Sequence, residues 1–425
     1  MLGLLCKSGA DSFFVGGGAM ERNMDYRSAR DLLLRMIVPP ETKLRIPLYR
    51  AAGRVLAEDI YAAGDVPPFD RSPYDGYAFR AEDTVNASET HPVTLQVLEE
   101  IPAGSMWTRS VTSGTASKIL TGAPIPPGAS AVIKYEDTVF TRDAVTISSP
   151  FSEGENVIPK GEDVHAGQLL AEAGTVTDSA LLGTLAAQHI TEPLVFPVPT
   201  VGIITTGSEL AEPGEALSGG KIVNTNRYTF LAALQKAGCE TCLLPTPGDD
   251  PKQIAYVMRE ALTQCDLVIT TGGVSVGDYD FTPDAMERAG AKVLIRTLFL
   301  KPGGASAYGI CDGKLICGLS GNPASALTNF YAVVHPLVRK LRGMAHPELT
   351  EIPVILAEEF RKKSPKTRLI RGILDLSDGA ARMHVSKGQG NGVLHSLIGC
   401  DVLAEIPAGS PALPAGTRLL AYLIP

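Results

Sequence analysis

Residues 267–280 read LVITTGGVSVGDYD, and this stretch decides the fold expected for the middle of the chain. Its first five residues are apolar or β-branched, as in a strand that is buried on both faces of a sheet. The loop that follows contains three glycines, whose successive N–H groups can form an anion-binding nest, and two aspartates close it. An anion together with a metal ion is the ligand that such a loop favours.

The same alternation of strand and helix extends on both sides of this stretch. Strands are predicted at 201–205 and 267–271, with helices at 225–236 and 254–263. This order is typical of β-α-β units with a mostly parallel sheet. Because ligands of such sheets bind beyond the carboxyl ends of the strands, a ligand site is expected at the loops after Thr205 and Thr271.

The flanking regions have different patterns. Helical spacing at 25–34, which ends before two prolines, and again at 178–188 encloses a segment of short β-like runs separated by Pro/Gly turns. Beyond residue 346 the chain is again β-like. A multidomain α/β plus β architecture is therefore expected, in this order: a disordered extension at 1–22; a helical linker domain from 23–62 and 156–196; an inserted β domain at 63–155; an α/β domain with a parallel-type sheet at 197–345; and a C-terminal β domain at 346–425.

Bulk properties exclude some classes of function. The formal net charge of -8 disfavours bulk binding of nucleic acid, since the overall field repels a phosphodiester backbone. No apolar run approaches the roughly 20 residues that span a bilayer, so no membrane partner is expected. Seven scattered cysteines suit a reducing compartment, which favours a cytoplasmic location.

Acidic candidates cluster at predicted strand ends of the α/β region. Glu209 follows the strand that ends near Thr206. In Asp249-Asp250-Pro251 the second aspartate is predicted to cap the next helix, which leaves Asp249 free to face a ligand.

Two further loops in this region can hold an anion. Lys301-Pro302-Gly303-Gly304 offers a cation beside glycine N–H groups, and Gly321-Asn322-Pro323 can open a helix whose first N–H groups favour negative charge. The basic run at 361–368 is more often a solvated face than a phosphate site.

One motif points to different chemistry. Residues 273–277 read GVSVG, the G-x-S-x-G pattern of a nucleophile elbow, which would make Ser275 the nucleophile of a serine hydrolase. An elbow needs a helix to begin at once, whereas several residues intervene here before the next predicted helix. The hydrolase is therefore the minor alternative.

Nine segments, taken in order, are similar to the signature segments of the molybdopterin molybdenumtransferase family, which includes the E domain of gephyrin. These segments are PPFDRSPYDGYA, ILTGAPIPPGA, GEDV, GIITTGSEL, GDDP, DLVITTGGVSVGDYD, KPGG, GNPASAL and KGQGNGV. The resemblance implies four domains per subunit, including a molybdopterin-binding-like α/β domain and a barrel-like C-terminal domain. It also implies a homodimer whose active cleft lies between the α/β domain of one subunit and the β domains of the other.

The resemblance implies an activity and a set of residues. The reaction would insert molybdate into adenylylated molybdopterin with release of AMP, with Mg²⁺ as cofactor. The residues that would line the cleft as catalytic groups are Asp75, Thr121, Asp163, Glu209, Asp249 and Asp280, of which Glu209, Asp249 and Asp280 would bind the metal ion. Those that would bind substrate are Thr206, Gly272, Gly273, Ser275, Arg296, Lys301, Gly321, Asn322, Pro323 and Arg371.

Several positions depart from the family pattern. Gly304 stands where a second lysine is common, Ser208 where an aspartate is common, Ser320 where a proline is common and Asn391 where a serine is common. Loss of positive charge beside the oxyanion leaves a second hypothesis open: a non-catalytic or tungstate-preferring paralogue that holds the pterin or acts as a scaffold.

Overall fold

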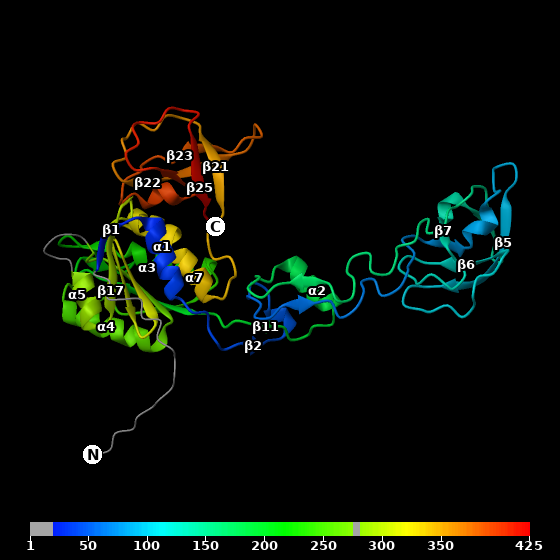
Figure 1. The fold of residues 1–425 in the computed structure, drawn as a ribbon, viewed down its shortest axis with the longest axis horizontal. Coiled ribbons are helices and arrows are strands. Elements are labelled where there is room, and N and C mark those ends of the chain that lie inside the picture. Colours follow the sequence, from blue (N-terminus) through cyan, green and yellow to red (C-terminus); the bar gives the residue numbers. More distant parts are fainter. Residues whose placement is uncertain (1–19, 275–280) are drawn as a thin grey trace, which may run out of the picture.

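The computed structural model describes residues 20–274 and 281–425. Figure 1 shows an elongated molecule, with the α/β domain and the C-terminal β domain packed together at one end and the inserted β domain at the other. A small unit that contains α2 (Ser179–Ala187) lies between them. No helix in the described ranges is both long enough and apolar enough to span a bilayer.

The α/β domain is built on a seven-stranded sheet of order β1-β17-β19-β20-β16-β12-β15. Strands β20, β16, β12 and β15 run parallel to one another, whereas β19 is antiparallel to both β17 and β20. The strands are β1 (Glu21–Met24), β12 (Thr200–Thr205), β15 (Glu240–Leu243), β16 (Leu267–Thr271), β17 (Lys292–Leu298), β19 (Ser306–Cys311) and β20 (Lys314–Leu319). The predicted parallel-type sheet is thus confirmed at its centre.

Helices cover both faces of this sheet. One face packs against α4 (Pro251–Gln264) and α5 (Phe281–Arg288), which enclose an apolar cluster around Met258 and Ile316. The other face, around Ile203 and Phe330, is covered by α1 (Tyr26–Met36), α3 (Thr225–Lys236) and the continuous run of α6 (Pro323–Asn329), the π-helix η4 (Phe330–Val334) and α7 (His335–Leu341). Burial on both faces explains why β16 has no polar alternation.

Two expectations about the N-terminal region are wrong. Residues Glu21 and Arg22, placed in a disordered extension, belong to β1 and pair with β17. Helix α1, placed in the linker domain, packs on the α/β domain, because Tyr26 and Leu33 are fully buried in the cluster around Phe330. Its apolar stripe was visible in the sequence, but the surface that it covers was not.

The linker unit has less helix than expected. Its core consists of Leu56, Ile60, Leu185 and Val195, and α2 is the helix that contributes to it. The remaining elements are short: β2 (Leu44–Arg45) pairs with β11 (Leu194–Val195), β3 (Ile60–Tyr61) pairs with β10 (Leu169–Ala171), and η1 is Leu48–Arg50. Repeated Pro and Gly residues in this region favour such turns over long helices.

The inserted domain is a six-stranded sheet of order β7-β4-β6-β5-β9-β8. Apolar clusters around Phe79 and around Ile119 cover its two faces. Its elements are β4 (Gly76–Phe79), η2 (Ala81–Thr84), β5 (Val93–Ile101), β6 (Thr115–Ile119), β7 (Ala131–Lys134), η3 (Tyr135–Asp137), β8 (Val139–Phe140) and β9 (Ala144–Ile147).

Two chain segments connect the inserted domain to the linker unit, and they bond to each other. Val66 and Val164 form an antiparallel bridge, as do Arg71 and Ile158. The N–H of Asp163 donates to the carbonyl of Val66 at 2.9 Å. The connection is therefore a narrow two-stranded ladder.

The C-terminal domain is a closed barrel. Strands β22, β23, β21, β25 and β24 follow one another, and β24 pairs back onto β22, which leaves no open edge. Their bounds are β21 (Glu351–Leu356), β22 (Thr367–Asp375), β23 (Arg382–Val385), β24 (Val402–Ile406) and β25 (Arg418–Leu423), with η5 at Leu394–Leu397. Val354, Met383 and Ala404 are fully buried in its core.

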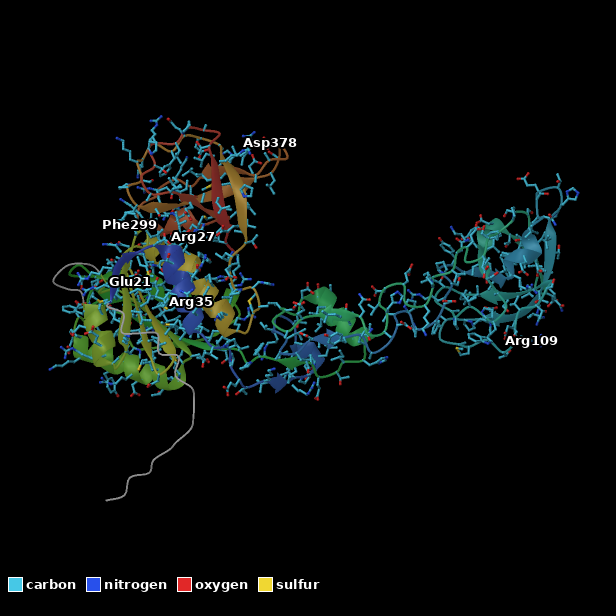
Figure 2. All side chains as sticks on the ribbon, in the orientation of Figure 1. Glu21, Arg27, Arg35, Arg109, Phe299 and Asp378 are labelled. Atoms are coloured by element: carbon cyan, nitrogen blue, oxygen red, sulfur yellow. The ribbon has the colours of Figure 1, made fainter. Side chains whose placement is uncertain are left out.

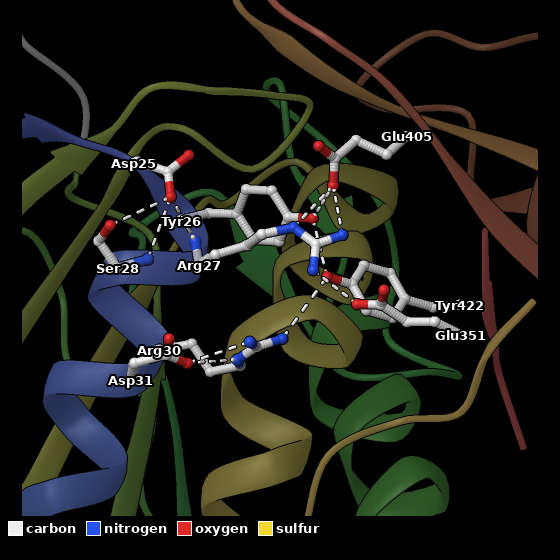
Figure 3. Close-up of polar contacts among 9 residues, drawn as sticks. All are labelled: Asp25, Tyr26, Arg27, Ser28, Arg30, Asp31, Glu351, Glu405 and Tyr422. Atoms are coloured by element: carbon white, nitrogen blue, oxygen red, sulfur yellow. Dashed lines mark hydrogen bonds and ion pairs between the residues drawn. The ribbon is translucent and has the colours of Figure 1, made fainter. Parts of the chain in front are cut away.

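The barrel is joined to the α/β domain by backbone and side-chain contacts. The short strand β18 (Leu300–Lys301) pairs with the start of β22. Figure 2 shows Phe299 at this junction, far from Arg109 in the inserted domain, and the Lys366 ammonium of the barrel lies 5.4 Å from the Phe299 ring centroid. In Figure 3 Arg27 of α1 donates to Glu351 at 2.6 Å and to Glu405 at 2.8 Å.

Candidate functional site

A cavity of about 810 Å³ opens at the carboxyl ends of β12 and β16. Eight of the residues singled out from the sequence line it: Thr206, Glu209, Asp249, Gly272, Gly273, Gly321, Asn322 and Pro323. Parallel strands bring their ends to one edge of the sheet, so residues as distant in the chain as Thr206 and Pro323 meet here. The site predicted at this edge is therefore assembled from the expected loops.

Local contacts shape the two acidic positions of this cavity. Asp249 accepts from the Ser208 hydroxyl at 2.7 Å and from the Ser208 N–H at 3.2 Å. Gly207 has a φ of +140°, which favours glycine in the turn that leads to Glu209. Asp250, which follows Asp249 in the chain, caps α4 by accepting from the Lys252 N–H at 2.9 Å.

A second cavity, of about 600 Å³, adjoins the first and is basic. Arg296 and Lys301 line it, as the sequence suggested. Both cavities are lined by Ala305, Ser320 and Asn322, so they form one cleft with an acidic half and a basic half. Such a cleft can hold a metal-bridged phosphate beside an oxyanion.

Two more cations in the basic half were missed from the sequence. Arg22 reaches it from β1, and Lys366 reaches it from the loop before β22. Arg22 was assigned to the extension, and Lys366 belonged to a basic run interpreted as a solvated face. The sequence around these two residues gives no sign of the cleft, because only the pairing of β1 with β17 and of β22 with β18 brings them there.

The walls of the basic half are held by backbone hydrogen bonds. The N–H of Gly303 donates to the Ser325 hydroxyl at 2.9 Å, and the carbonyl of Gly303 accepts from the Asn329 amide at 2.7 Å. The Ser325 N–H in turn donates to the carbonyl of Asn391 at 3.0 Å. Loops from the α/β domain and the barrel are thus locked together around the cleft.

The departures from the family pattern have structural reasons. A Cβ on Gly304 would lie 2.4 Å from the carbonyl oxygen of Leu300 and 2.8 Å from that of Leu298, so no side chain fits there without a backbone shift. Ser208 provides hydrogen-bond donors to Asp249, where an aspartate would repel it. The hydroxyl of Ser320 accepts from the N–H of Asn322 at 3.2 Å.

Asp75 and Thr121 form a separate pair in the inserted domain, and Asp163 lies on the two-stranded ladder that connects this domain to the linker unit. Asp75 accepts from both the N–H and the hydroxyl of Thr121 at 2.7 Å, and these bonds, with a smaller effect from Lys118, lower the pKa of Asp75. All three predicted residues are exposed. Within one chain they lie far from the α/β domain that carries Glu209 (Figure 1).

The assignment of Arg371 to substrate binding is wrong for this structure. Its side chain is fully buried under the loop 386–391 and lines neither half of the cleft. Its guanidinium donates to the carbonyls of Gly388 at 3.2 Å and Gly390 at 3.1 Å, and burial lowers its pKa. Arg371 therefore holds the loop that ends at Asn391, rather than the ligand.

Two predicted residues, Ser275 and Asp280, lie outside the described residues. Among the described residues no group of three or more histidine, cysteine, aspartate or glutamate side chains is arranged to hold a metal ion. Glu209 and Asp249 alone still suit Mg²⁺, which takes one or two carboxylates and completes its coordination with water and substrate phosphates.

Comparison with known proteins agrees with this geometry. Residues 24–188 match the family described as MoeA N-terminal region (domain I and II), residues 202–340 match the probable molybdopterin binding domain, and residues 353–424 match the MoeA C-terminal region (domain IV). Together these matches cover most of the chain.

Similar proteins show the same relationship over most of their length. The molybdopterin molybdenumtransferases of Staphylococcus aureus (strain Mu50) and Staphylococcus epidermidis (strain ATCC 12228) are each 36% identical, and each alignment covers 88% of this chain and 89% of the relative. A crystal structure of the molybdopterin biosynthesis moeA protein from Pyrococcus horikoshii OT3 superimposes with a TM-score of 0.81 at 34% identity, covering 94% of this chain and 100% of the other. With both the domain order and the cleft in agreement, the chain belongs to the molybdopterin molybdenumtransferase family.

Proposed function

We propose that this chain inserts molybdate into adenylylated molybdopterin and releases AMP, in the biosynthesis of the molybdenum cofactor. The observation that carries the proposal is the two-part cleft, whose acidic and basic halves meet at Ala305, Ser320 and Asn322. A pyrophosphate-linked substrate and a dianionic oxyanion need two such neighbouring environments. The Staphylococcus relatives are named for this transfer.

Each half of the cleft has its own task in the reaction. In the acidic half Glu209 and Asp249 would hold Mg²⁺, which offsets charge on the phosphate oxygens when the phosphoanhydride to AMP breaks. In the basic half Lys301, Arg296 and Lys366 orient molybdate and neutralise its charge. Gly272 and Gly273 lie on the acidic side, where the absence of side chains would let the phosphate chain approach the backbone closely.

We further propose that the working form is a homodimer. Asp75 and Thr121 are held together at the distal end of the molecule, where the cleft of the same chain cannot use them. A two-fold partner would bring its distal end to this cleft, because a symmetric pair exchanges equivalent surfaces. The described cysteines are free thiols, which supports a cytoplasmic location for this assembly.

Release of AMP tests the proposed activity. Purified protein incubated with adenylylated molybdopterin, molybdate and Mg²⁺ is expected to release AMP, measured by chromatography. Tight pterin binding without AMP release, across a series of divalent metal ions, would favour the non-catalytic paralogue instead. Faster release with tungstate than with molybdate would favour the tungstate-preferring form.

The serine hydrolase is tested independently. A fluorophosphonate probe labels an activated serine, so the hydrolase predicts labelling that Ser275→Ala removes. The transferase predicts that the wild-type chain is not labelled.

A further inference from the structure

A third cavity, of about 350 Å³, lies at the joint between the α/β domain and the barrel, and shares no lining residue with the cleft. It is bounded by the last residue of α3, by α7 and the loop after it, and by the end of β25. Figure 1 shows α7 close to the C-terminus of the chain, on the side where the linker unit begins. We propose that this cavity binds the phosphate group of a small phosphomonoester.

Two arginines of this cavity converge on a neutral atom. Arg339 donates through Nε to the Met344 sulfur at 3.4 Å, and the Nη1 atom of Arg342 lies 4.0 Å from the same sulfur. Their other donors bind the carbonyls of Glu348 and Gly53. A thioether is a weak acceptor, so guanidinium groups gathered around it remain available to a stronger one.

Neither guanidinium is neutralised by an acidic side chain. Across 20–274 and 281–425, Arg339 and Arg342 form no ion pair, and the ammonium of Lys236 at the same cavity forms none either. Burial lowers the pKa of both arginines, and the charge of Arg342 lowers that of Arg339 further. The carboxylate of Glu348 partly opposes this effect on Arg339, and Pro425, the last residue of the chain, also lines the cavity. Two guanidinium groups and the Lys236 ammonium outnumber these acidic groups, so the cavity has an excess of positive charge.

A buried histidine forms part of the same wall. The side chain of His335 is 4% exposed and lines the cavity, and within 20–274 and 281–425 its Nδ1 atom has no hydrogen-bond partner. Burial, together with Arg339 and Arg342, lowers its pKa to about 4. The ring is thus neutral at pH 7 and forms an uncharged wall beside the two guanidinium groups.

The apolar walls of the cavity indicate that the ligand has an organic group besides its phosphate. Ala237, Leu349, Leu423 and Ile424 give the cavity an apolar side opposite its cations. A free phosphate ion would contact the cations alone, whereas a phosphomonoester also places its organic group on this apolar side. Cation and apolar surface together are the usual composition of a small-molecule site.

Binding of phenyl phosphate to the full-length chain tests the proposal, with inorganic phosphate as the second probe. Calorimetric titration of Lys301→Gln, which weakens anion binding in the cleft, should still show a phenyl phosphate site. In this background Arg342→Gln and Lys236→Gln are each expected to weaken that site about tenfold or more, because each removes a charge-assisted hydrogen bond or a cation. Lys236 is exposed and makes no hydrogen bond with the described residues, so its substitution should leave the fold intact. Lys236→Gln therefore still tests the proposal if Arg342→Gln fails to fold.

Arg259→Gln is the matched control, since this exposed arginine donates to the carbonyl of Arg288 and lines none of the three cavities discussed. Its affinity for phenyl phosphate should equal that of the parent. Equal affinity in Lys236→Gln and Arg342→Gln would overturn the proposal, as would tighter binding of inorganic phosphate than of phenyl phosphate. AMP release is not part of this test, so its outcome is independent of the proposed transferase activity.

Discussion

Adjacent aspartates in the acidic half of the cleft have different tasks. Asp249 accepts from Ser208 and lines the cleft, whereas Asp250 accepts from Lys252 and caps α4. The sequence predicted this division, because an aspartate directly before proline at a helix start is a typical cap. One pair of substitutions can therefore separate chemistry from stability.

Asp249→Ala is expected to reduce AMP release at least about a hundredfold with an unchanged melting temperature, since it removes a metal ligand from an exposed position. Asp250→Ala should lower stability by about 1 kcal/mol and retain most of the activity. Initial rates and thermal unfolding of both variants provide the comparison. Equal loss of activity in the two variants would show that position 249 has no special role.

The backbone around Gly304 explains why this chain has glycine where the family commonly has a lysine. From the sequence alone this departure was interpreted as a loss of positive charge. Because a Cβ at this position meets two backbone carbonyls, Gly304→Ala should destabilise the protein by about 1 to 3 kcal/mol. Gly183→Ala is the control, since Gly183 lies within α2 with open space around it and should be stabilised by about 0.5 to 1 kcal/mol. Denaturant unfolding measures both. A stable, more active Gly304→Lys would contradict this view.

Thr121 sets the protonation of Asp75. Thr121→Val removes the hydroxyl donor, so the pKa of Asp75, now below its ordinary value, should rise. Any stability that depends on the charged Asp75 is lost as the pH falls through its folded-state pKa, and in the variant this loss should begin at a higher pH. An NMR titration of the Asp75 carboxyl measures the shift, with Asp65 of the adjacent connection as the unchanged reference.

Among the elements, α1 shows most clearly what the sequence can and cannot predict. Its spacing predicted a helix at 25–34, and the structure has one at Tyr26–Met36 capped by Asp25. Its partner was not predictable, since an apolar stripe defines a face of the helix but not the surface that covers it. The same limit applies to β1, whose pairing with β17 joins segments some 270 residues apart.

Arg27 joins α1 to the barrel (Figure 3). It donates to Glu351 and Glu405, and the Tyr26 hydroxyl also donates to Glu405. Arg27→Met should lower the stability of the barrel by about 1 to 3 kcal/mol, because it leaves two partly buried carboxylates without their cation. Arg35→Met, on the same helix (Figure 2), is the control and should have little effect. Amide hydrogen exchange in β21 and β24 reports the difference.

For the whole molecule, order along the chain predicted the domains better than it predicted the site. Residues that follow strands of one sheet, such as Glu209 and Asp249, meet as expected because parallel strands end at one edge. Arg371 was misplaced because a strand pattern does not tell which of two faces points into a barrel. Lys366 and Arg22 were missed because contacts between domains have no local sequence signal.

Mixtures of two inactive variants test whether Asp75 of one chain completes the cleft of another chain. Asp75→Ala and Glu209→Ala should each be inactive alone, yet an equal mixture refolded together should recover about one quarter of the wild-type activity. In such a mixture half of the dimers are hybrids, and each hybrid has one cleft free of both substitutions. No recovery would mean that each chain must supply both residues to its own cleft. Asp75→Ala mixed with Thr121→Ala is the control and should recover nothing.

The two-stranded ladder at Val66 and Val164 has a consequence for assembly. A single tether would let the distal sheet swivel, whereas two segments bonded to each other resist both twisting and bending. The position of Asp75 relative to the linker unit is therefore fixed within one chain. Little conformational entropy would then be lost if a second subunit binds. The orientation of the distal sheet is thus built into a single chain through contacts that form as it folds.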